Sequence, residues 1–501
     1  MLRFASRCKL VGRKWVGSSW AGCDPAAALR WLAALAAAAL LLATQGCASL
    51  APPTSPDTTI DVPAAWSAGD GATSLADWWL RFNDPLLAKL VAQAMQTNTS
   101  VRSAQAALRQ ARALRDVTAA SLWPDVGASA SAQHNTSGKE SRGNNFRAGL
   151  DASWEADIFG ANRSALAASD ATAAASGANL GDVRRSIAAE VALAYIAIRG
   201  SQARLAIAEA NLASQLETLQ ITLWRQQAGL VTALEAEQAR GQTEQTRAQL
   251  PALRTSIGQT SHALAVLTGR PPAALSAELA SAGPVPEAVD DLALGVPADT
   301  LRQRPDVRAA ELQVTAALAR VAQADAARLP NFKLGGSLGL SALTIGALTN
   351  SASLVTTLLA SVSMPVFDGG ASRAQVRAQQ AALEQAGVAY QAAVLTALKE
   401  VEDALVALRG DRERLLRLRN AADAAGNAAL LARQRYSSGL VDFQTVLETQ
   451  RTQLSTQDSV AGATADLGAD HIRLYKALGG GWRAESGDST SQPPATRTSR
   501  L

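Results

Sequence analysis

The chain repeats its own pattern at a spacing of about 200 residues. Residues 101–104 (VRSA) recur as 307–310 (VRAA), an offset of 307−101 = 206. Residues 229–231 (GLV) recur as 439–441, an offset of 439−229 = 210. This period excludes a solenoid, whose units run roughly 20–50 residues. We infer that one architectural half was duplicated, so that the function needs a structure that two similar halves build together.

Each half contains two short stretches in which apolar and polar residues alternate. In the first half these stretches are 125–133 and 146–158, and in the second half they are 331–341 and 358–366. Alternation with a period of two predicts strands with one apolar and one polar face. We expect a β-hairpin in each half, joined in the first half by a polar, exposed loop over 134–145. A soluble four-stranded sheet packed on helices is the alternative.

The rest of each half has a helical composition. Residues 161–250 and 366–492 contain no proline and are rich in strong helix formers. A helix from about Ser372 to Tyr436 would hold 436−372+1 = 65 residues, roughly 97 Å at 1.5 Å per residue. Frequent alanines allow long helices to approach closely, as in coiled coils. The predicted fold class is therefore mainly α, with each half made of a β-hairpin and a long helical hairpin. Glycines at 160 and 369–370 suit the corners between strand and helix.

The amino terminus has the features of an export signal. Six basic residues and one acidic residue accompany an apolar run over 31–43, which is too short to span a membrane. The run ends at Thr44-Gln45-Gly46-Cys47, which resembles the lipobox of bacterial lipoproteins except at Thr44 and Gln45. We expect a signal peptide over 1–46 and a lipid on Cys47. An ordinary signal peptide with an incidental cysteine is the alternative.

Removal of this leader changes the charge of the chain. Of 47 basic and 43 acidic residues, 47−6 = 41 and 43−1 = 42 would remain. The slight basicity therefore belongs to the leader, and no nucleic-acid partner is expected. Cys47 would be the only cysteine left, which excludes a disulfide framework. The predicted organisation is a lipidated segment over 47–100, a first repeat over 101–270, a linker over 271–304, a second repeat over 305–482 and a disordered tail over 483–501.

The four strands suit the wall of a membrane barrel. Transmembrane strands need about 9–11 residues, and unpaired edges inside a bilayer are costly. Four strands cannot close a barrel, because the smallest have about eight. A chain of this kind has to oligomerise if its strands cross a membrane. A dimer would give a barrel filled by side chains, whereas a trimer would supply 12 strands and a wider lumen.

Short motifs in order along most of the mature chain resemble the outer membrane factors, the TolC-like channel lipoproteins of the OprM/NodT group. The matching segments are 78–86 (WWLRFNDPL), 154–160 (WEADIFG), 267–272 (LTGRPP), 304–311 (RPDVRAAE), 365–370 (PVFDGG) and 436–439 (YSSG). The resemblance implies a homotrimer with a 12-stranded barrel in the outer membrane and a long α-helical periplasmic tunnel. It also implies docking to a periplasmic adaptor (membrane fusion) protein and an inner-membrane pump of the RND type. Such a chain is a passive exit duct for drugs or other small molecules, with no enzyme activity and no cofactor except the lipid, a palmitate-bearing anchor on Cys47.

The resemblance places the adaptor contact at the turn of each helical hairpin. In the second half this turn contains Ser438, Gly439 and Leu440, and in the first half it contains Gly229 and Leu230.

The same resemblance places a periplasmic constriction just after the second turn. Glu448 matches a position that carries an acidic ring in relatives, while Thr445 and Asp442 lie nearby; the first-half counterparts of 445 and 448 are Glu235 and Gln238. Three copies of Glu448 around a narrow axis would favour cations. A solvated glutamate on a helix surface is the alternative.

Three other functions remain in view. The first is the exit channel of a protein secretion system, and the second is a coiled-coil lipoprotein that is not a channel. The third is a hydrolase, because Gly335-Gly336-Ser337-Leu338-Gly339 matches a nucleophile elbow. That motif requires a turn between strand and helix, whereas Ser337 lies within an alternating strand. His134, His262 and His471 are too scattered for a metal site.

Overall fold

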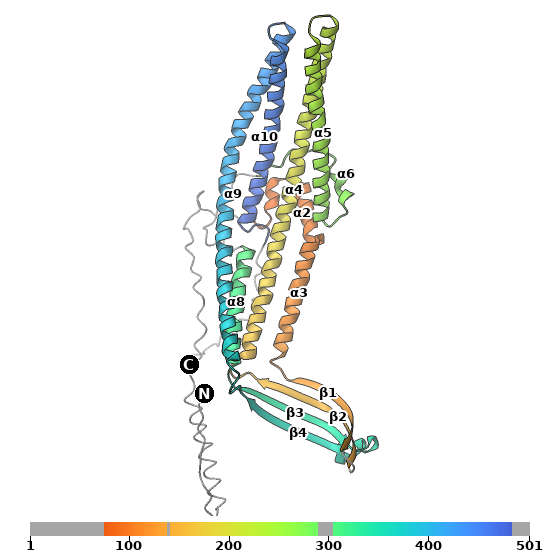
Figure 1. Ribbon diagram of the computed structural model, residues 1–501, viewed down its shortest axis with the longest axis vertical. Helices are drawn as coiled ribbons and strands as arrows, with labels where there is room; N and C mark the ends of the chain where they lie inside the picture. Colours follow the sequence, from red (N-terminus) through yellow and green to blue (C-terminus); the bar gives the residue numbers. More distant parts are fainter. Residues whose placement is uncertain (1–74, 138–140, 289–303, 483–501) are drawn as a thin grey trace, which may run out of the picture. The chain divides into compact units, whose positions relative to one another are not determined.

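The computed structural model describes residues 75–137, 141–288 and 304–482 (Figure 1). The predicted leader, Cys47 and the tail over 483–501 lie outside the described residues. Seven helices of more than ten residues carry most of the described chain: α2 (Pro85–Thr97), α3 (Thr99–Ala120), α4 (Ala161–Gln227), α5 (Ala233–Leu267), α8 (Pro305–Ala326), α9 (Ala371–Ser437) and α10 (Phe443–Ala477). Shorter helical turns are η1 (Trp78–Phe82), η2 (Pro272–Leu275), α6 (Ser276–Leu279), η3 (Ile345–Thr349) and η4 (Ser351–Ser353). Of the helices described, none is long and apolar enough to cross a membrane.

The predicted long helix is confirmed. Helix α9 holds 67 residues, two more than expected, and pairs with α10 of 35 residues. Helices α4 and α5 have the same two lengths, 67 and 35 residues. Helices α3 and α8 both have 22 residues. The order and lengths of the helices therefore agree with a two-fold internal repeat.

A junction between helix ends also recurs in both halves. Asn98, just before α3, donates from Nδ2 to the carbonyl of Leu267 at 2.8 Å, at the end of α5. Arg304, just before α8, donates from Nη1 to the carbonyl of Ala477 at 2.8 Å, at the end of α10. The offsets are 304−98 = 206 and 477−267 = 210. Both halves therefore close one helix end against another with a buried side chain.

The strands form one antiparallel sheet in the order β1-β2-β3-β4. Their bounds are Asp125–Ser137, Ser141–Ala156, Asn331–Ala342 and Leu354–Ser363. The register places Leu150 beside Leu338 and Trp154 beside Leu334, so the apolar side chains of neighbouring strands share one face. This apolar face is open: Leu358 is 80 % exposed and Val126 is 63 % exposed. The described helices therefore do not cover the apolar face of the sheet. A soluble sheet packed on helices would need that face to be covered.

Several predicted strand boundaries are wrong, including the end of the second strand, which was expected at 158 and lies at Ala156. The expected loop over 134–145 is mostly strand, because the ladder continues through the pair His134 and Asn144, whose Nδ1 and Oδ1 atoms lie 2.6 Å apart. Polar residues extend the strands here because ladder hydrogen bonds come from the backbone. The last strand was expected over 358–366 but spans Leu354–Ser363. Pro365 has no N–H for the ladder, so the strand ends before it.

The strand register locates the four residues by which the repeat offset changes. Asp125 pairs with Ser153 in β1 and β2, and the equivalent pair in β3 and β4 is Asn331 with Ser363. The offsets are 331−125 = 206 and 363−153 = 210. The four extra residues therefore lie entirely in the β3–β4 connection, which contains η3 and η4.

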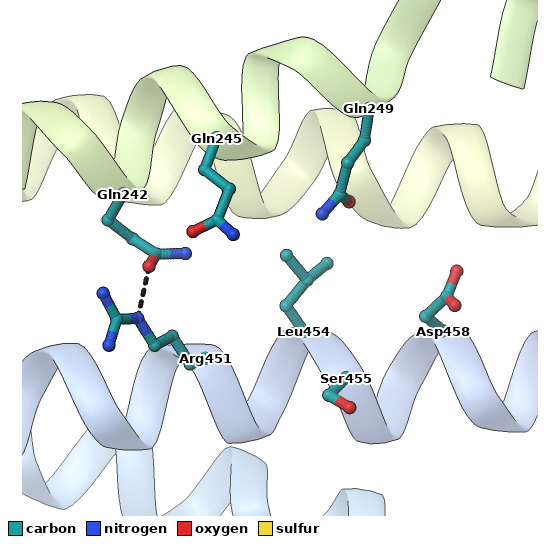
Figure 2. Close-up of a pocket in the computed structure, with 7 residues that line it drawn as sticks. All are labelled: Gln242, Gln245, Gln249, Arg451, Leu454, Ser455 and Asp458. Atoms are coloured by element: carbon teal, nitrogen blue, oxygen red, sulfur yellow. Dashed lines mark hydrogen bonds between the residues drawn. The ribbon is translucent and has the colours of Figure 1, made fainter. Parts of the chain in front are cut away.

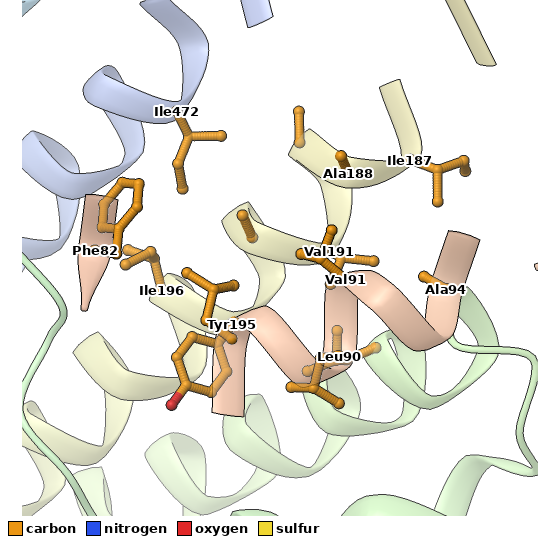
Figure 3. Packing of buried hydrophobic residues seen from close by; sticks show 14 of the residues in the cluster. Phe82, Leu90, Val91, Ala94, Ile187, Ala188, Val191, Tyr195, Ile196 and Ile472 are labelled. Atoms are coloured by element: carbon orange, nitrogen blue, oxygen red, sulfur yellow. The ribbon is translucent and has the colours of Figure 1, made fainter. Parts of the chain in front are cut away.

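The main hydrophobic core lies where α2, α4, α5 and α10 meet. Figure 3 shows Leu90 and Val91 of α2 beside Val191 and Ile196 of α4, with Ile472 of α10 nearby. All five side chains are at most 1 % exposed. This core fixes the bases of both helical hairpins, whereas their far ends pack through a smaller cluster described below.

Candidate functional site at the tips of the helical hairpins

Both helical hairpins have the same backbone conformation at their turns. Gly229 has φ = 72° and Gly439 has φ = 71°, a left-handed conformation that favours glycine. The next amide closes each turn: Leu230 donates to the carbonyl of Arg225 at 2.8 Å, and Leu440 donates to the carbonyl of Arg435 at 2.9 Å. This is the Schellman pattern of helix termination. Leu230 and Leu440 are each 74 % exposed, so apolar side chains mark the two turns.

Asp442 begins the second helix of the second hairpin. Its Oδ1 accepts from the backbone N–H of Thr445 at 2.9 Å, and the Thr445 hydroxyl bonds to the same carboxylate. These hydrogen bonds from Thr445 hold the pKa of Asp442 below its usual value. In the first half Thr232 occupies the corresponding place and makes no side-chain cap. Two of the three predicted constriction residues are therefore engaged with each other at the start of α10.

Glu448 lies one turn further along α10, on the exposed side of the helix. Thr445, Glu448 and Thr452 follow one another at spacings of three and four residues, which places them on one face. The opposite face is buried, with Val446 at 0 % and Leu447 at 2 % exposure. Within the described chain, no hydrogen bond or ion pair engages the Glu448 carboxylate. The structure thus places Glu448 on a polar helix face, with its charge available to solvent or to another chain.

The tip of the second hairpin is tied to the first hairpin by one arginine. Arg225 of α4 donates from Nη2 to the carbonyl of Ser437 at 3.1 Å and from Nη1 to the carbonyl of Tyr436 at 3.4 Å. Its guanidinium carbon also lies 4.6 Å from the centre of the Tyr436 ring. A cation at the carboxyl end of a helix is favoured by the helix dipole. Arg225 therefore caps the end of α9 from the neighbouring hairpin.

Tyr436 completes this tie from the other side. Its hydroxyl lies 3.5 Å from Oε2 of Glu235 on α5. Its ring packs against Phe443 with centroids 5.5 Å apart. Phe443 also belongs to a small buried cluster with Ala239 of α5 and Leu447 of α10. We call Arg225, Glu235 and Tyr436 the tip lock, because they join the ends of α4, α5 and α9.

Below the tip lock the two hairpins meet through polar contacts. Arg204 of α4 makes a two-pronged ion pair with Asp458 of α10, with Nε–Oδ1 at 2.7 Å and Nη2–Oδ2 at 2.9 Å. Thr218 and Gln450 lie 3.0 Å apart between their side-chain oxygen and nitrogen. Further pairs across the same boundary are Asn211 with Gln457, Ser214 with Arg433 and Gln242 with Arg451. Hydrogen-bonded polar pairs, rather than a continuous apolar core, thus hold this length of the hairpins together.

A groove of about 580 Å³ follows this boundary between α5 and α10 (Figure 2). Glutamine side chains of α5 line one wall and α10 supplies the other: Gln242, Gln245, Gln249, Arg451, Leu454, Ser455 and Asp458. The dashed contact in Figure 2 joins Arg451 to Gln242 across the groove. Its polar lining offers no nucleophile held by a base, so it carries no catalytic arrangement.

Sequence reasoning located the turns but missed the contacts between hairpins. In the sequence, Glu235 was identified only as the counterpart of Thr445 in the repeat. No motif or spacing indicated a role for Arg225. The partners in the tip lock are 201 to 212 positions apart in sequence. Helical periodicity relates only residues a few positions apart, so it cannot predict such pairs. The Ser337 motif lies within β3, where Ser337 pairs with Asp151 and Thr357 as expected for a strand residue.

Comparison with known proteins gives three consistent findings. A family model described as outer membrane efflux protein matches residues 90–270 and 296–480. The chain is 34 % identical over 451 residues to the pyoverdine export outer membrane protein OpmQ of Pseudomonas putida, covering 87 % of this chain and 95 % of that protein. It is 33 % identical to nodulation protein T of Rhizobium leguminosarum bv. viciae, covering 90 % and 94 % of the two chains.

The fold also resembles that of a solved channel. The outer-membrane channel OprN superposes with a TM-score of 0.80 at 36 % sequence identity. The match covers 86 % of this chain and 99 % of that one, and therefore includes both the sheet and the helical hairpins.

Proposed function

The chain belongs to the outer membrane efflux protein family, and on that premise we propose that it is the passive exit channel of a tripartite efflux system. The observation that carries this proposal is the uncovered sheet joined to two long helical hairpins. A sheet of this kind needs a lipid environment for one face and further strands for its edges. The helical hairpins would then extend into the periplasm, toward a pump that supplies the energy.

The sheet has what a segment of a membrane barrel requires. One face carries exposed apolar side chains, including Leu358 at 80 %, Val362 at 63 % and Leu338 at 52 %. Burying such a face in lipid is favourable by about 25 cal/mol per Å². Strands β1 and β4 lie at the two edges and have no second neighbour within the described residues. Three copies with four strands each would close these edges in a 12-stranded barrel, which is why we propose a homotrimer built from six duplicated halves.

The other face of the sheet would line the lumen. It mixes small residues, with serines at 129, 131, 337, 341 and 361 and glycines at 127, 149, 335 and 339, with the charged side chains of Arg147, Asp151, Glu155 and Lys333. The serines and glycines leave room for a passage, and the charged side chains keep its wall hydrophilic. This lining suits a duct for varied small molecules, and pyoverdine export by the relative OpmQ is consistent with such cargo.

We assign the partners to the hairpin tips. The exposed turns at Gly229, Leu230, Ser438, Gly439 and Leu440 would contact a periplasmic adaptor protein, which links the channel to an inner-membrane pump of the RND type. Helix ends with exposed leucines offer apolar anchors for such a contact. The tip lock and the polar pairs below it would hold the periplasmic end closed until the adaptor is engaged.

The membrane anchor is proposed from the sequence alone. Export through the leader over 1–46 would expose Cys47 as the first residue, and its thiol would carry the lipid. Mass spectrometry of the mature amino-terminal peptide tests this: a lipid adduct is expected in the native chain and is expected to be lost in Cys47→Ser. An unmodified Cys47 in the exported protein would show that the strands alone hold the protein in the outer membrane.

The decisive experiment is the conductance of the purified, detergent-extracted oligomer in a planar bilayer. Discrete channels from a trimer are expected. A non-conducting coiled-coil lipoprotein would give none, which would overturn the proposal. Loss of small-molecule resistance on deletion, with protein secretion unchanged, would separate an efflux duct from a secretion channel.

Glu448 gives a prediction about ion selectivity. If three Glu448 carboxylates surround the axis near the tip, Glu448→Ala would remove three negative charges from a constriction. We expect weaker cation selectivity and weaker block by multivalent cations in single-channel recordings. The matched control is Glu237→Ala, which removes an exposed carboxylate of α5 that already pairs with Arg240 at 2.9 Å. Equal block in the native and Glu448→Ala channels would leave Glu448 as an ordinary surface residue.

A further inference from the structure

Two aspartates interrupt the apolar contact between α9 and α10 near the base of the second helical hairpin. On the α10 side this contact is a stripe of apolar side chains at helical spacing: Leu467, Leu474 and Ala477. Asp470 lies on the same stripe, three residues after the first of them and four before the second. On α9, Asp411 falls between the buried Leu408 and Leu415. We call this contact, over residues 405–415 of α9 and 467–477 of α10, the seam.

The duplication provides an internal comparison for these two positions. Helices α4 and α5 have the same lengths as α9 and α10, so the offset of 210 holds along both hairpins. The counterpart of Asp411 is residue 411−210 = 201, a serine, and the counterpart of Asp470 is residue 470−210 = 260, a threonine. The first hairpin therefore has neutral hydroxyl side chains at both places. A carboxyl pair is not needed to build such a hairpin, and it distinguishes the second from the first.

The carboxyl group of Asp470 is buried and lacks one partner. Asp470 is 1 % exposed. Its Oδ1 accepts from Nη1 of Arg473 at 2.6 Å, whereas its Oδ2 accepts no hydrogen bond from the described residues. The side chain that reaches Asp470 from α9 is the carboxyl group of Asp411. Ionised carboxylates only accept hydrogen bonds, so these two can bond to each other only when one carries a proton.

We propose that Asp411 and Asp470 form a proton-binding site that controls the seam between α9 and α10. One proton shared between the two carboxyl groups makes an O–H···O bond across the seam, and its loss leaves two like charges facing each other there. The proton is exchanged with water through Asp411, whose side chain is 25 % exposed, and only an O–H bond forms or breaks. The site lies in the helical part, so it depends neither on the barrel nor on the partners assigned above.

The other charged and titratable groups around this site come from three helices. They are Asp466, His471, Arg473 and Tyr475 of α10, Arg412 and Arg414 of α9, and Arg204 of α4. Burial raises the pKa of Asp470, and the hydrogen bond with Asp411 raises that pKa further, while Arg473 opposes both. The Arg473 side chain is 58 % exposed, so water screens its charge. Arg414 lies 3.5 Å from Asp411, which is a long contact.

The sign of the pH effect identifies the group that causes it. Because the pKa of Asp470 is raised, the folded chain binds this proton more tightly than the unfolded chain does. The resulting stability is fully present below about pH 4, the ordinary value for aspartate, and is lost as the pH rises through the raised value. His471 has the opposite sign, because burial lowers its pKa and acid then weakens the fold. A seam that tightens on acidification therefore reports Asp470.

Amide hydrogen exchange of the full-length, detergent-purified oligomer tests the proposal. Protection factors, corrected for the intrinsic exchange rate at each pH, are compared at about pH 5 and about pH 7. The seam segments 405–415 and 467–477 are expected to be better protected at the lower pH, by up to about tenfold for each unit by which the pKa is raised. Their counterparts over 195–205 and 257–267 are measured in the same sample and are expected to show no such change.

Neutral variants separate the shared proton from the ion pair. Asp470→Asn keeps the size of the side chain and offers an amide donor to Asp411 at every pH, so the seam is expected to be protected at both pH values. Asp411→Asn is expected to act in the same way, and it decides the question if Asp470→Asn does not fold. The matched control is Asp403→Asn, because Asp403 is exposed on α9 and pairs with Lys399 one turn earlier. That variant is expected to keep the native difference.

Two results would overturn the proton-binding site. One is equal protection of the seam at both pH values in the native chain. The other is protection that falls below the native level at both pH values in each of the two neutral variants, which would make the aspartates ordinary ion-pair partners of Arg473 and Arg414. Channels recorded from the same preparation keep the proposed function in either case, whereas a preparation with a pH-sensitive seam and no conductance overturns the channel alone.

Discussion

Arg225→Ala combined with Tyr436→Phe is expected to raise the open fraction of the reconstituted channel by about twentyfold. Arg225 holds the carbonyls of Tyr436 and Ser437 and stacks over the Tyr436 ring, while the Tyr436 hydroxyl reaches Glu235. The double variant removes every contact of the tip lock except ring packing. The two hairpin tips then lose the groups that join them, and the periplasmic end of the tunnel opens more often.

The size of this effect follows from the contacts removed. A partly exposed cation–π contact contributes about 0.5–1 kcal/mol, and hydrogen bonds from a charged donor contribute about 1.5 kcal/mol or more. A loss of roughly 2 kcal/mol changes an equilibrium constant about 30-fold, since 1.4 kcal/mol corresponds to a factor of ten. A channel that is open about 1 % of the time would then be open for roughly a quarter of it.

Single-channel recording measures the open fraction directly. In cells, the sensitivity to large antibiotics reports how often the channel is open in the outer membrane. The matched control is Arg240→Ala, because Arg240 is exposed on α5 and pairs only within its own helix, with Glu237. That variant is expected to behave as the native channel. An unchanged open fraction in the double variant would show that the tip lock is structural and that closure depends on contacts between copies.

Arg304→Ala is expected to cause the largest loss of stability in the helical part. Arg304 is 1 % exposed, and its guanidinium reaches Asp306 Oδ2 at 2.6 Å, Glu400 Oε2 at 2.7 Å and the Ala477 carbonyl at 2.8 Å. Alanine leaves a cavity, an unpaired carbonyl and two carboxylates without their shared cation. Breaking a buried pair costs about 3–5 kcal/mol, and the partial exposure of Asp306 and Glu400 reduces this to roughly 2–3 kcal/mol.

The same site predicts how stability depends on pH. Burial opposes ionisation of Asp306, but the Arg304 hydrogen bond and the charges of Arg185 and Arg304 hold its pKa below the usual value. A carboxyl group with a lowered pKa stabilises the folded state at neutral pH, and this contribution is lost as the pH falls through the lowered value, below about 4. In Arg304→Ala the acid-sensitive contribution is expected to shrink, because the main group that lowers the pKa is gone.

Thermal unfolding of the detergent-solubilised protein measures both effects. The midpoint of Arg304→Ala is expected to fall by several degrees at pH 7, and the difference from the native chain is expected to narrow near pH 3. Arg308→Ala is the control, because Arg308 is exposed one turn later on α8. Arg304→Lys keeps a charge without the fork of donors, so partial recovery is expected. Identical midpoints for Arg304→Ala and Arg308→Ala would contradict this account.

Much of the fold could be predicted because its signals are local. Alternation with a period of two located all four strands, and a proline-free run of helix formers predicted α9 to within one residue at each end. The turn residues could also be placed, since a left-handed glycine ends each long helix. These features depend on neighbouring residues, which a single sequence displays directly.

The errors arose where local polarity and backbone pairing disagree. The polar stretch over 134–145 has the composition of a loop, yet most of it continues the β1–β2 ladder. The register also places all four extra residues of the second half in the β3–β4 connection. Backbone hydrogen bonds determine where the strands extend and how they pair. Amino-acid composition is a poor predictor of those hydrogen bonds.

The sequence by itself determined the duplication, the alternation of strands with long helices, and the turns at Gly229 and Gly439. Only the tertiary structure decided that Arg225 caps the end of α9 and that Arg304 closes α10. These contacts join residues about 170 to 210 positions apart, and their formation depends on how the two halves pack. Local sequence preferences fix each helix and strand, whereas the free energy of packing and charge pairing selects which ends meet.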